Sequence, residues 1–146
     1  MPARMRLEEV APEGYRTVME LHAYARATVD PVLLELVKLR ASMVNRCAYC
    51  VDTHSTEATE AGEDPRRLFA LAAWRETPFF SARERAALAL TDAVTRVADA
   101  GVPDDVWDEV TRHFTEKEAA DLVMAIIMMN SFNRIAISTR KVPAVP

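Results

Sequence analysis

Signals that begin and end α-helices punctuate the sequence at short intervals. An aspartate followed by a proline favours a helix N-cap and first turn, and this pair occurs at residues 30–31 and 64–65. The segments SARE (81–84) and TEKE (115–118) fit capping boxes, in which a hydroxyl and a carboxylate bind free backbone amides reciprocally. Only three glycines occur in 146 residues, too few for the turns of a typical β-rich fold. These signals predict an all-α fold.

About seven helices follow from this punctuation and from the 3.6-residue period of the apolar positions. One domain is expected, because a chain of this length supports a single core. We place it at residues 14–140, between an N-terminal arm (1–13) and a C-terminal tail (141–146) that both contain prolines. Asn45 is expected to cap a helix that begins near Arg46. The predicted helices lie near residues 14–29, 31–44, 46–62, 65–76, 82–100, 103–114 and 115–137.

The charge and hydropathy of the chain exclude several functional classes. A formal net charge of −4 gives no electrostatic footprint for nucleic acid. The charged N-terminus lacks the apolar core of a signal peptide, and no uninterrupted apolar run reaches the roughly 18 residues of a membrane span. The most apolar stretch, LVMAIIMM (122–129), is therefore expected to be a buried helix. We expect a cytoplasmic protein without nucleic-acid or membrane partners.

Both cysteines of the chain lie in the segment CAYC (47–50), four residues before His54. On a helix, Cys47, Cys50 and His54 share one edge, and the two cysteine Cα atoms lie within disulfide range. Cys47 would occupy the first turn, where free amides lower the pKa of a thiol. His54 could accept a proton near neutral pH. Together they provide the parts of a thiol peroxidase or a dithiol oxidoreductase.

Two other interpretations of the cysteine pair stay open at the level of spacing. The thiols could be structural, packed in the core. They could also bind zinc, but a structural zinc site needs four ligands, and neither His22 nor His113 lies at a matching spacing. We read both histidines as structural or surface residues. Redox chemistry is the favoured interpretation, because close cysteine pairs in the cytosol are more often reactive than structural.

The pattern E-x(11)-C-x-x-C-x-x-x-H, formed here by Glu35, Cys47, Cys50 and His54, resembles the core motif of the AhpD-like alkylhydroperoxidases. These proteins belong to the carboxymuconolactone decarboxylase superfamily. The segment LFALAAWRETPFFSARERAALALTDAVTRV (68–97) is also similar to the common continuation of that motif. The resemblance covers roughly residues 30–137.

The resemblance implies an AhpD-like helical fold assembled as a trimer or hexamer. It implies that Cys50 is oxidised by a hydroperoxide and that Cys47 resolves the product to a disulfide. Cys47 would be the more accessible thiol and would meet the reductant, a lipoylated or thioredoxin-like dithiol protein. Glu35 and His54 would form a proton relay to Cys50. No bound cofactor or metal is implied.

Three further residues qualify this picture. Tyr49 stands where well-studied members of the family often have a histidine, and a phenol, with a pKa of about 10, cannot relay protons at neutral pH as imidazole does. Tyr49 is still able to form hydrogen bonds, and Trp74 is a second candidate for the peroxide pocket. Taken alone, Glu35 fits an exposed side chain paired with Lys38 or Arg40, whereas its place in the motif favours catalysis.

The leading functional hypothesis is a thiol-dependent alkylhydroperoxidase with antioxidant activity. Its rivals are a non-catalytic oligomeric redox sensor and a protein-disulfide reductase. A lyase of the carboxymuconolactone decarboxylase type is disfavoured, because that branch of the superfamily does not rely on a CxxC pair.

Overall fold

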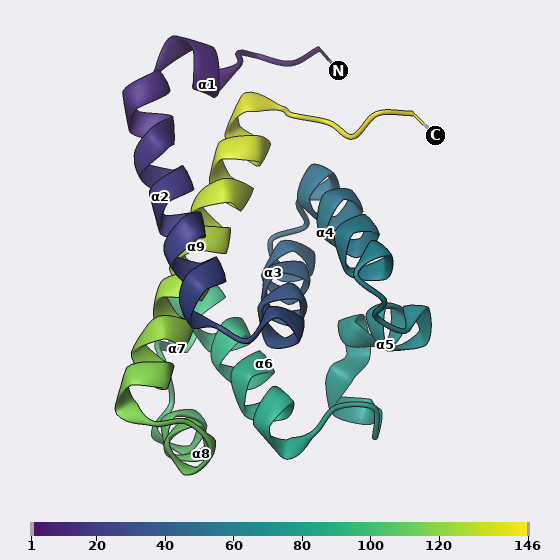
Figure 1. The fold of residues 1–146 in the computed structure, drawn as a ribbon, viewed down its shortest axis with the longest axis vertical. Helices are drawn as coiled ribbons and strands as arrows, with labels where there is room; N and C mark the ends of the chain where they lie inside the picture. Colours follow the sequence, from purple (N-terminus) through teal and green to yellow (C-terminus); the bar gives the residue numbers. More distant parts are fainter. Residues whose placement is uncertain (1, 146) are drawn as a thin grey trace.

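The structure of the chain is a computed structural model that describes residues 2–145. Met1 and Pro146, the outermost residues of the predicted arm and tail, lie outside the described residues. The described part forms a single all-helical domain without strands, which confirms the predicted fold class (Figure 1). Its elements are α1 (Leu7–Val10), α2 (Pro12–Thr28), α3 (Pro31–Val44), α4 (Ala48–Glu60), α5 (Pro65–Ala70), the 3₁₀ helix η1 (Leu71–Glu76), α6 (Ala82–Thr95), α7 (Val97–Ala100), α8 (Asp104–His113) and α9 (Glu116–Thr139).

The predicted helix signals act as expected at most boundaries. The side chains of Asp30 and Asp64 accept backbone hydrogen bonds at the starts of α3 and α5, and a proline follows each in the first turn. Both predicted capping boxes are complete, at the starts of α6 and α9. Gly62 and Gly101 adopt positive φ angles of 94° and 66° just after α4 and α7, a conformation that is costly for other residues.

The predicted helix start near Arg46 is wrong. Asn45 ends α3, and Arg46 adopts a left-handed φ of 56°. The amides of Arg46 and Cys47 donate to the carbonyls of Met43 and Ser42, the two hydrogen bonds of a Schellman motif. The predicted end of α3 at Val44 is correct, but this motif normally uses glycine, so the arginine in its place concealed the turn that delays the start of α4. Helix α4 begins two residues later, with Cys47 as its N-cap.

Three other boundaries differ from the prediction. The expected helix over 82–100 breaks at Arg96 into α6 and α7. The helix near 65–76 changes to a 3₁₀ helix after Ala70. The N-terminal arm contains α1 and the first residues of α2. The first two differences are interruptions within a predicted helix, and the third is a short additional helix. The spacing of apolar residues does not locate helix ends to within one or two residues.

Helix α3 lies at the centre of the domain and packs against α4, α6 and α9, while α2 runs alongside α9 (Figure 1). Because α3 is covered on several sides, it contributes to two separate apolar clusters. One cluster, which includes Val37, Leu90 and Ile126, also contains both cysteines. The other lies under α5 and η1 and includes Leu36, Leu71 and Trp74. This arrangement fixes the start of α4 against the core.

Helix α9 is long and apolar enough to cross a membrane by length and composition alone. In the structure, however, it packs against α2, α3 and α6, and residues such as Leu122, Ile126 and Met129 are buried in the core. Packing inside the domain therefore accounts for one face of α9, as expected for the stretch LVMAIIMM, while Met124, Ile127 and Ile137 are exposed.

The two ends of the chain meet at one end of the molecule (Figure 1). The amide of Arg4 donates to the Thr139 carbonyl at 2.8 Å, and the Arg4 side chain donates to the Ser138 carbonyl at 3.0 Å. Beyond α9, Lys141 approaches Glu8 of α1, with the Nζ and Oε1 atoms 3.9 Å apart. The predicted arm and tail thus join over the cavity described below.

Candidate active site

The two cysteines are joined by a disulfide, with their Cα atoms 5.3 Å apart. Cys47 is the N-cap of α4, and its sulfur accepts a hydrogen bond from the backbone amide of Cys50 at 3.4 Å. Cys50 lies in the first turn of the same helix. The local fold therefore brings the two sulfurs together without distortion of neighbouring elements.

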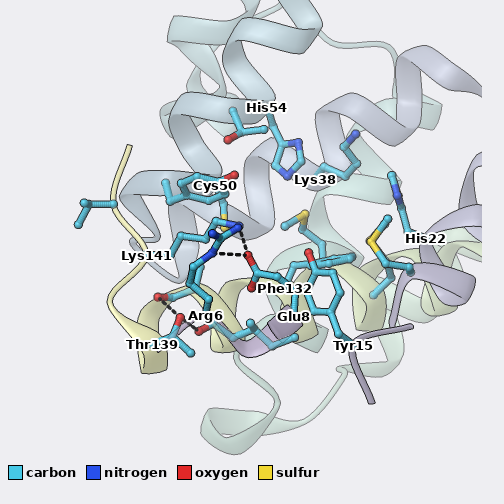
Figure 2. Close-up of a pocket in the computed structure, with 18 of the residues that line it drawn as sticks. Arg6, Glu8, Tyr15, His22, Lys38, Cys50, His54, Phe132, Thr139 and Lys141 are labelled. Carbon is cyan, nitrogen blue, oxygen red and sulfur yellow. Dashed lines mark hydrogen bonds and ion pairs between the residues drawn. The ribbon is translucent and has the colours of Figure 1, made fainter. Parts of the chain in front are cut away.

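Cys50 opens onto a cavity of about 450 Å³ between α2, α4, α9 and the two joined chain ends. Most of its wall is apolar and comes from side chains such as Met19, Met128 and Phe132. Figure 2 shows His54 and Lys38 near Cys50, and His22 further along the cavity. A cavity of this size and character suits a small organic molecule.

Cys47 does not line this cavity, and its exposed fraction is 1%, against 3% for Cys50. The expectation that Cys47 is the more accessible thiol is therefore wrong for this structure. The reason is the Schellman turn, which directs Cys47 back under the end of α3 while Cys50, one turn on, faces the cavity.

A hydrogen-bonded network of four charged or titratable side chains lies beside Cys50. The ammonium group of Lys38 donates to Oε1 of Glu35 at 2.8 Å and to Oε2 of Glu57 at 3.4 Å. The same Glu57 oxygen lies 3.0 Å from Nδ1 of His54. Since a carboxylate only accepts hydrogen bonds, Nδ1 donates, and a neutral ring keeps Nε2 free to accept a proton.

Glu35 and His54 lie close together but do not bind each other. The carboxylate of Glu35 is paired with Lys38, and its second oxygen is buried without a hydrogen-bond partner among the described residues. The side chain of Glu35 is only 22% exposed. Glu35 therefore forms the ion pair predicted for a surface residue, but it is mostly buried, as predicted for a residue of the site. The predicted relay is thus interrupted by Lys38.

The surroundings of His54 favour its neutral form. Burial lowers the pKa of His54, and the nearby charge of Lys38 lowers it further, against the opposing effect of Glu57. Burial would raise the pKa of Glu57, but the hydrogen bond from His54 and the charge of Lys38 outweigh it and lower that pKa. At neutral pH the pair is therefore a carboxylate beside a neutral imidazole, the state of a competent base.

Oxygen and nitrogen atoms of Glu35, His54 and Glu57 lie within 4.8 Å of one another, a spacing that could suit a metal ion. The Lys38 ammonium, which is itself buried, donates to both carboxylates and supplies the positive charge at their centre. A divalent cation would have to displace it or tolerate its repulsion. The side chains present therefore fit a proton-handling network better than a metal site.

The remaining candidates divide between the cavity and the core. Tyr49 lines the cavity, where Lys141 lies over its ring at 4.6 Å. Trp74 lies away from the cavity, buried in the second apolar cluster, where its indole donates to Asp92 at 3.2 Å. His22 lines the cavity and packs edge-on against Phe132, and His113 binds Glu109 on the outside of α8.

The pairing of Glu35 with Lys38, one of the two partners expected for Glu35, is confirmed, but the sequence reasoning missed Glu57 and the contact of Lys38 with it. Both carry a helical signal, because Lys38 lies three residues after Glu35 and Glu57 three residues after His54. Applying this spacing to each member of the motif would have identified Glu57.

The fold and site define an all-helical protein with a disulfide-bonded cysteine pair at the start of α4. The model of the carboxymuconolactone decarboxylase family matches residues 12–93, and the chain belongs to this family as an AhpD-like member. The uncharacterised protein YdfG of Bacillus subtilis is 37% identical over 139 residues, which cover 94% of this chain and 95% of YdfG.

Solved structures show the same fold. Protein ATU0492 of Agrobacterium tumefaciens, a protein of unknown function proposed to be the antioxidant defence protein AhpD, superposes with a TM-score of 0.96. It is 35% identical, and the match covers 99% of this chain and 100% of ATU0492. The debrominase Bmp8 superposes with a TM-score of 0.82 over 91% of this chain and 73% of its own. At 22% identity, Bmp8 shows a shared fold alone.

Proposed function

We propose that this protein is a thiol-dependent peroxidase that reduces organic hydroperoxides through a Cys47–Cys50 dithiol cycle. The observation that carries the proposal is the position of Cys50, which forms a disulfide with Cys47 and faces the same cavity as His54. Family membership and the likeness to ATU0492 support an antioxidant or related role. The apolar cavity wall suits the carbon skeleton of an organic peroxide.

The cycle begins with the reduced protein. His54, held by Glu57, takes the proton of the Cys50 thiol, because the thiolate is the nucleophile. The sulfur attacks the terminal oxygen of the hydroperoxide, so that an S–O bond forms and the O–O bond breaks. The alkoxide takes a proton from His54 and leaves as an alcohol.

Cys47 then resolves the sulfenic acid on Cys50. Its sulfur attacks the Cys50 sulfur, an S–S bond forms, and the hydroxyl group leaves as water after taking a proton. The Cys47 sulfur accepts the Cys50 amide hydrogen bond, which stabilises negative charge on Cys47 at this step. Two thiols and one hydroperoxide thus give a disulfide, an alcohol and water.

An external dithiol must reduce the disulfide to complete the cycle. We expect a lipoylated or thioredoxin-like partner, and the cavity leads it to Cys50 rather than to Cys47. Both sulfurs are almost completely buried. A dithiol on a long, narrow side chain, such as a lipoyl group, therefore reaches Cys50 more easily than a dithiol on a flat protein surface does.

The same burial favours a second candidate function, a non-catalytic redox sensor. A sensor needs one oxidation and slow recovery, which buried sulfurs would provide. Burial also argues against a general protein-disulfide reductase, whose sulfurs must reach folded substrates.

Continuous consumption of cumene hydroperoxide in the presence of dihydrolipoamide separates the two functions. A peroxidase consumes many equivalents, whereas a sensor stops after one. Cys50→Ser should abolish consumption, and Cys47→Ser should stop at a single equivalent with a sulfenic acid on Cys50. Serine is a good N-cap, so the Cys47→Ser variant keeps the start of α4 and serves as a matched control for folding. Undiminished turnover by Cys50→Ser would refute the assignment.

A further inference from the structure

Lys38 is a buried cation in the wall of the cavity, and it links two helices. It belongs to α3, one turn after Glu35, and reaches Glu57 of α4. Only 4% of the residue is exposed, so the cost of removing its charge from water has to be offset by these two carboxylates. Both contacts lie beside His54, on which the proposed chemistry depends.

The geometry at Glu57 joins Lys38 to His54 through one atom. Oε2 of Glu57 lies 3.4 Å from the Lys38 ammonium and 3.0 Å from Nδ1 of His54. The side chain of Glu57 is half exposed, so without these partners it would have freedom to turn towards solvent. Lys38 therefore helps to hold the carboxylate that fixes the tautomer and orientation of the imidazole.

We propose that Lys38 is a positioning residue of the thiol site. It fixes Glu57 beside His54, and its own positive charge disfavours protonation of the imidazole ring. This role rests on the proposed thiol chemistry at Cys50, but it can be tested without any peroxide turnover. This role differs from the predicted relay of Glu35 and His54. Here Glu35 is the ion-pair partner of Lys38, and Glu57 is the carboxylate that contacts His54 directly.

Every charged group that faces His54 has to be considered for its titration. Helix α3 contributes Lys38 and Glu35, and α4 contributes Glu57 and Cys50. Helix α2 contributes His22, whose pKa is lowered by burial and by the same Lys38 charge. The part of α9 that lines the cavity here is apolar, with Met128, Met129 and Phe132. The joined chain ends add Arg6, Glu8 and Lys141 to the cavity wall. Among these cations, Lys38 is the one that donates to the carboxylate bound by His54.

The test is the pH titration of the His54 ring by NMR in the reduced protein, with the signal assigned from the His54→Gln variant. Lys38→Met keeps the length of the side chain and removes its charge. We expect the His54 pKa to rise, because the imidazolium no longer meets a neighbouring cation and this effect on His54 exceeds that of the Glu57 hydrogen bond. Release of Glu57 is read separately from the chemical shifts of the ring nitrogens, as a loss of the Nδ1–H tautomer. The rate of Cys50 alkylation by iodoacetamide, measured in a Cys47→Ser background, should show its acid limb displaced in the same direction.

Lys38→Met leaves the mostly buried Glu35 carboxylate without its ion-pair partner and so could fail to fold. The double variant Lys38→Met/Glu35→Gln removes the buried ion pair together and should retain an upward shift, since Lys38 influences His54 more strongly than Glu35 does. Lys117→Met is the matched control, because Lys117 pairs with Asp121 outside the cavity.

An unchanged His54 titration in the folded double variant would overturn the proposal, as would an equal shift in Lys117→Met. These outcomes are distinct from a failure of the proposed function. If the wild-type protein consumes no peroxide while the His54 titration still depends on Lys38, the peroxidase assignment fails and the inference about Lys38 stands.

Discussion

Two clusters of buried charge lie on different sides of α3, and they differ in how completely their polar groups are paired. In the first, the Asp92 carboxylate accepts two hydrogen bonds from Arg40, at 2.6 and 3.1 Å. It also accepts one from Arg75 at 2.6 Å and one from the Trp74 indole at 3.2 Å. Arg40 uses its remaining donors on carbonyls of η1. This cluster joins α3, α6 and η1.

The second cluster contains Lys38, only two residues from Arg40 along α3. Here Glu35 keeps one buried oxygen without a partner, and the contact between Lys38 and Glu57 is long at 3.4 Å. The cluster adjoins the cavity and Cys50, whereas the Asp92 carboxylate is buried away from the cavity, beside the second apolar cluster. Complete pairing suits a group that holds elements together, and incomplete pairing beside a cavity suits groups that must exchange protons.

The largest effect that separates the clusters is expected at Asp92. Asp92→Asn leaves two arginines without a buried counter-charge, and breaking such a pair costs about 3–5 kcal/mol. Urea unfolding monitored by circular dichroism measures the loss. Asp108→Asn, an exposed change on α8, should cost less than about 0.5 kcal/mol. Equal stabilities of the two variants would show that the Asp92 cluster does not hold the fold.

The second effect concerns reactivity. His54→Gln removes the proposed base but retains an amide that can bind Glu57, so we expect the unfolding free energy to change little. The rate of Cys50 oxidation by cumene hydroperoxide should fall by about 10²-fold, the usual contribution of a general base. Stopped-flow fluorescence of the reduced protein measures it. A rate within twofold of wild type would remove His54 from the mechanism.

A smaller difference is expected between the two cysteines. Each single variant leaves one cysteine to react with iodoacetamide. We expect Cys50, in the Cys47→Ser variant, to react several times faster than Cys47 in the Cys50→Ser variant, because Cys50 faces the cavity. Mass spectrometry of timed samples gives both rates. Faster labelling of Cys47 would restore the accessible role that the family resemblance implies for it.

The smallest effect is a dependence of stability on pH. The pKa of His54 in the folded chain is lower than its ordinary value of 6.5, so below that pH the unfolded chain binds the proton first. Stability should therefore decline as the pH falls through this range, and His54→Gln should reduce the slope. The pKa of Asp92 is lowered by its bonds to Arg40 and Arg75, despite burial, so its contribution is lost only at more acid pH. Urea midpoints measured from neutral pH to well below 3.8, the ordinary pKa of aspartate, test both.

Much of the fold was predictable because helix caps are local. Asp30, Asp64 and both capping boxes act within four residues of their own position, and the sequence displays them directly. The turn between α3 and α4 was not predictable in this way, because Arg46 adopts a conformation that sequence patterns assign to glycine. That single turn also determines which cysteine faces the cavity.

The sequence indicated which side chains lie near Cys50 better than it indicated how they pair. Helical spacing placed Cys47, Cys50 and His54 on one edge, and the motif added Glu35. Spacing along one helix could not show that Lys38 lies between Glu35 and Glu57, since that depends on how α3 packs against α4. The cavity likewise depends on the meeting of the chain ends, which are more than 130 residues apart in the sequence.

The most direct test of the central claim is the intact mass of the reduced protein after addition of one equivalent of cumene hydroperoxide. The account predicts that the wild-type chain loses two hydrogen atoms as the Cys47–Cys50 disulfide forms, and that the Cys50→Ser chain keeps its mass. An unchanged wild-type mass, or the same oxidation of Cys50→Ser at its remaining thiol, would contradict the assignment of Cys50 as the residue that attacks the peroxide.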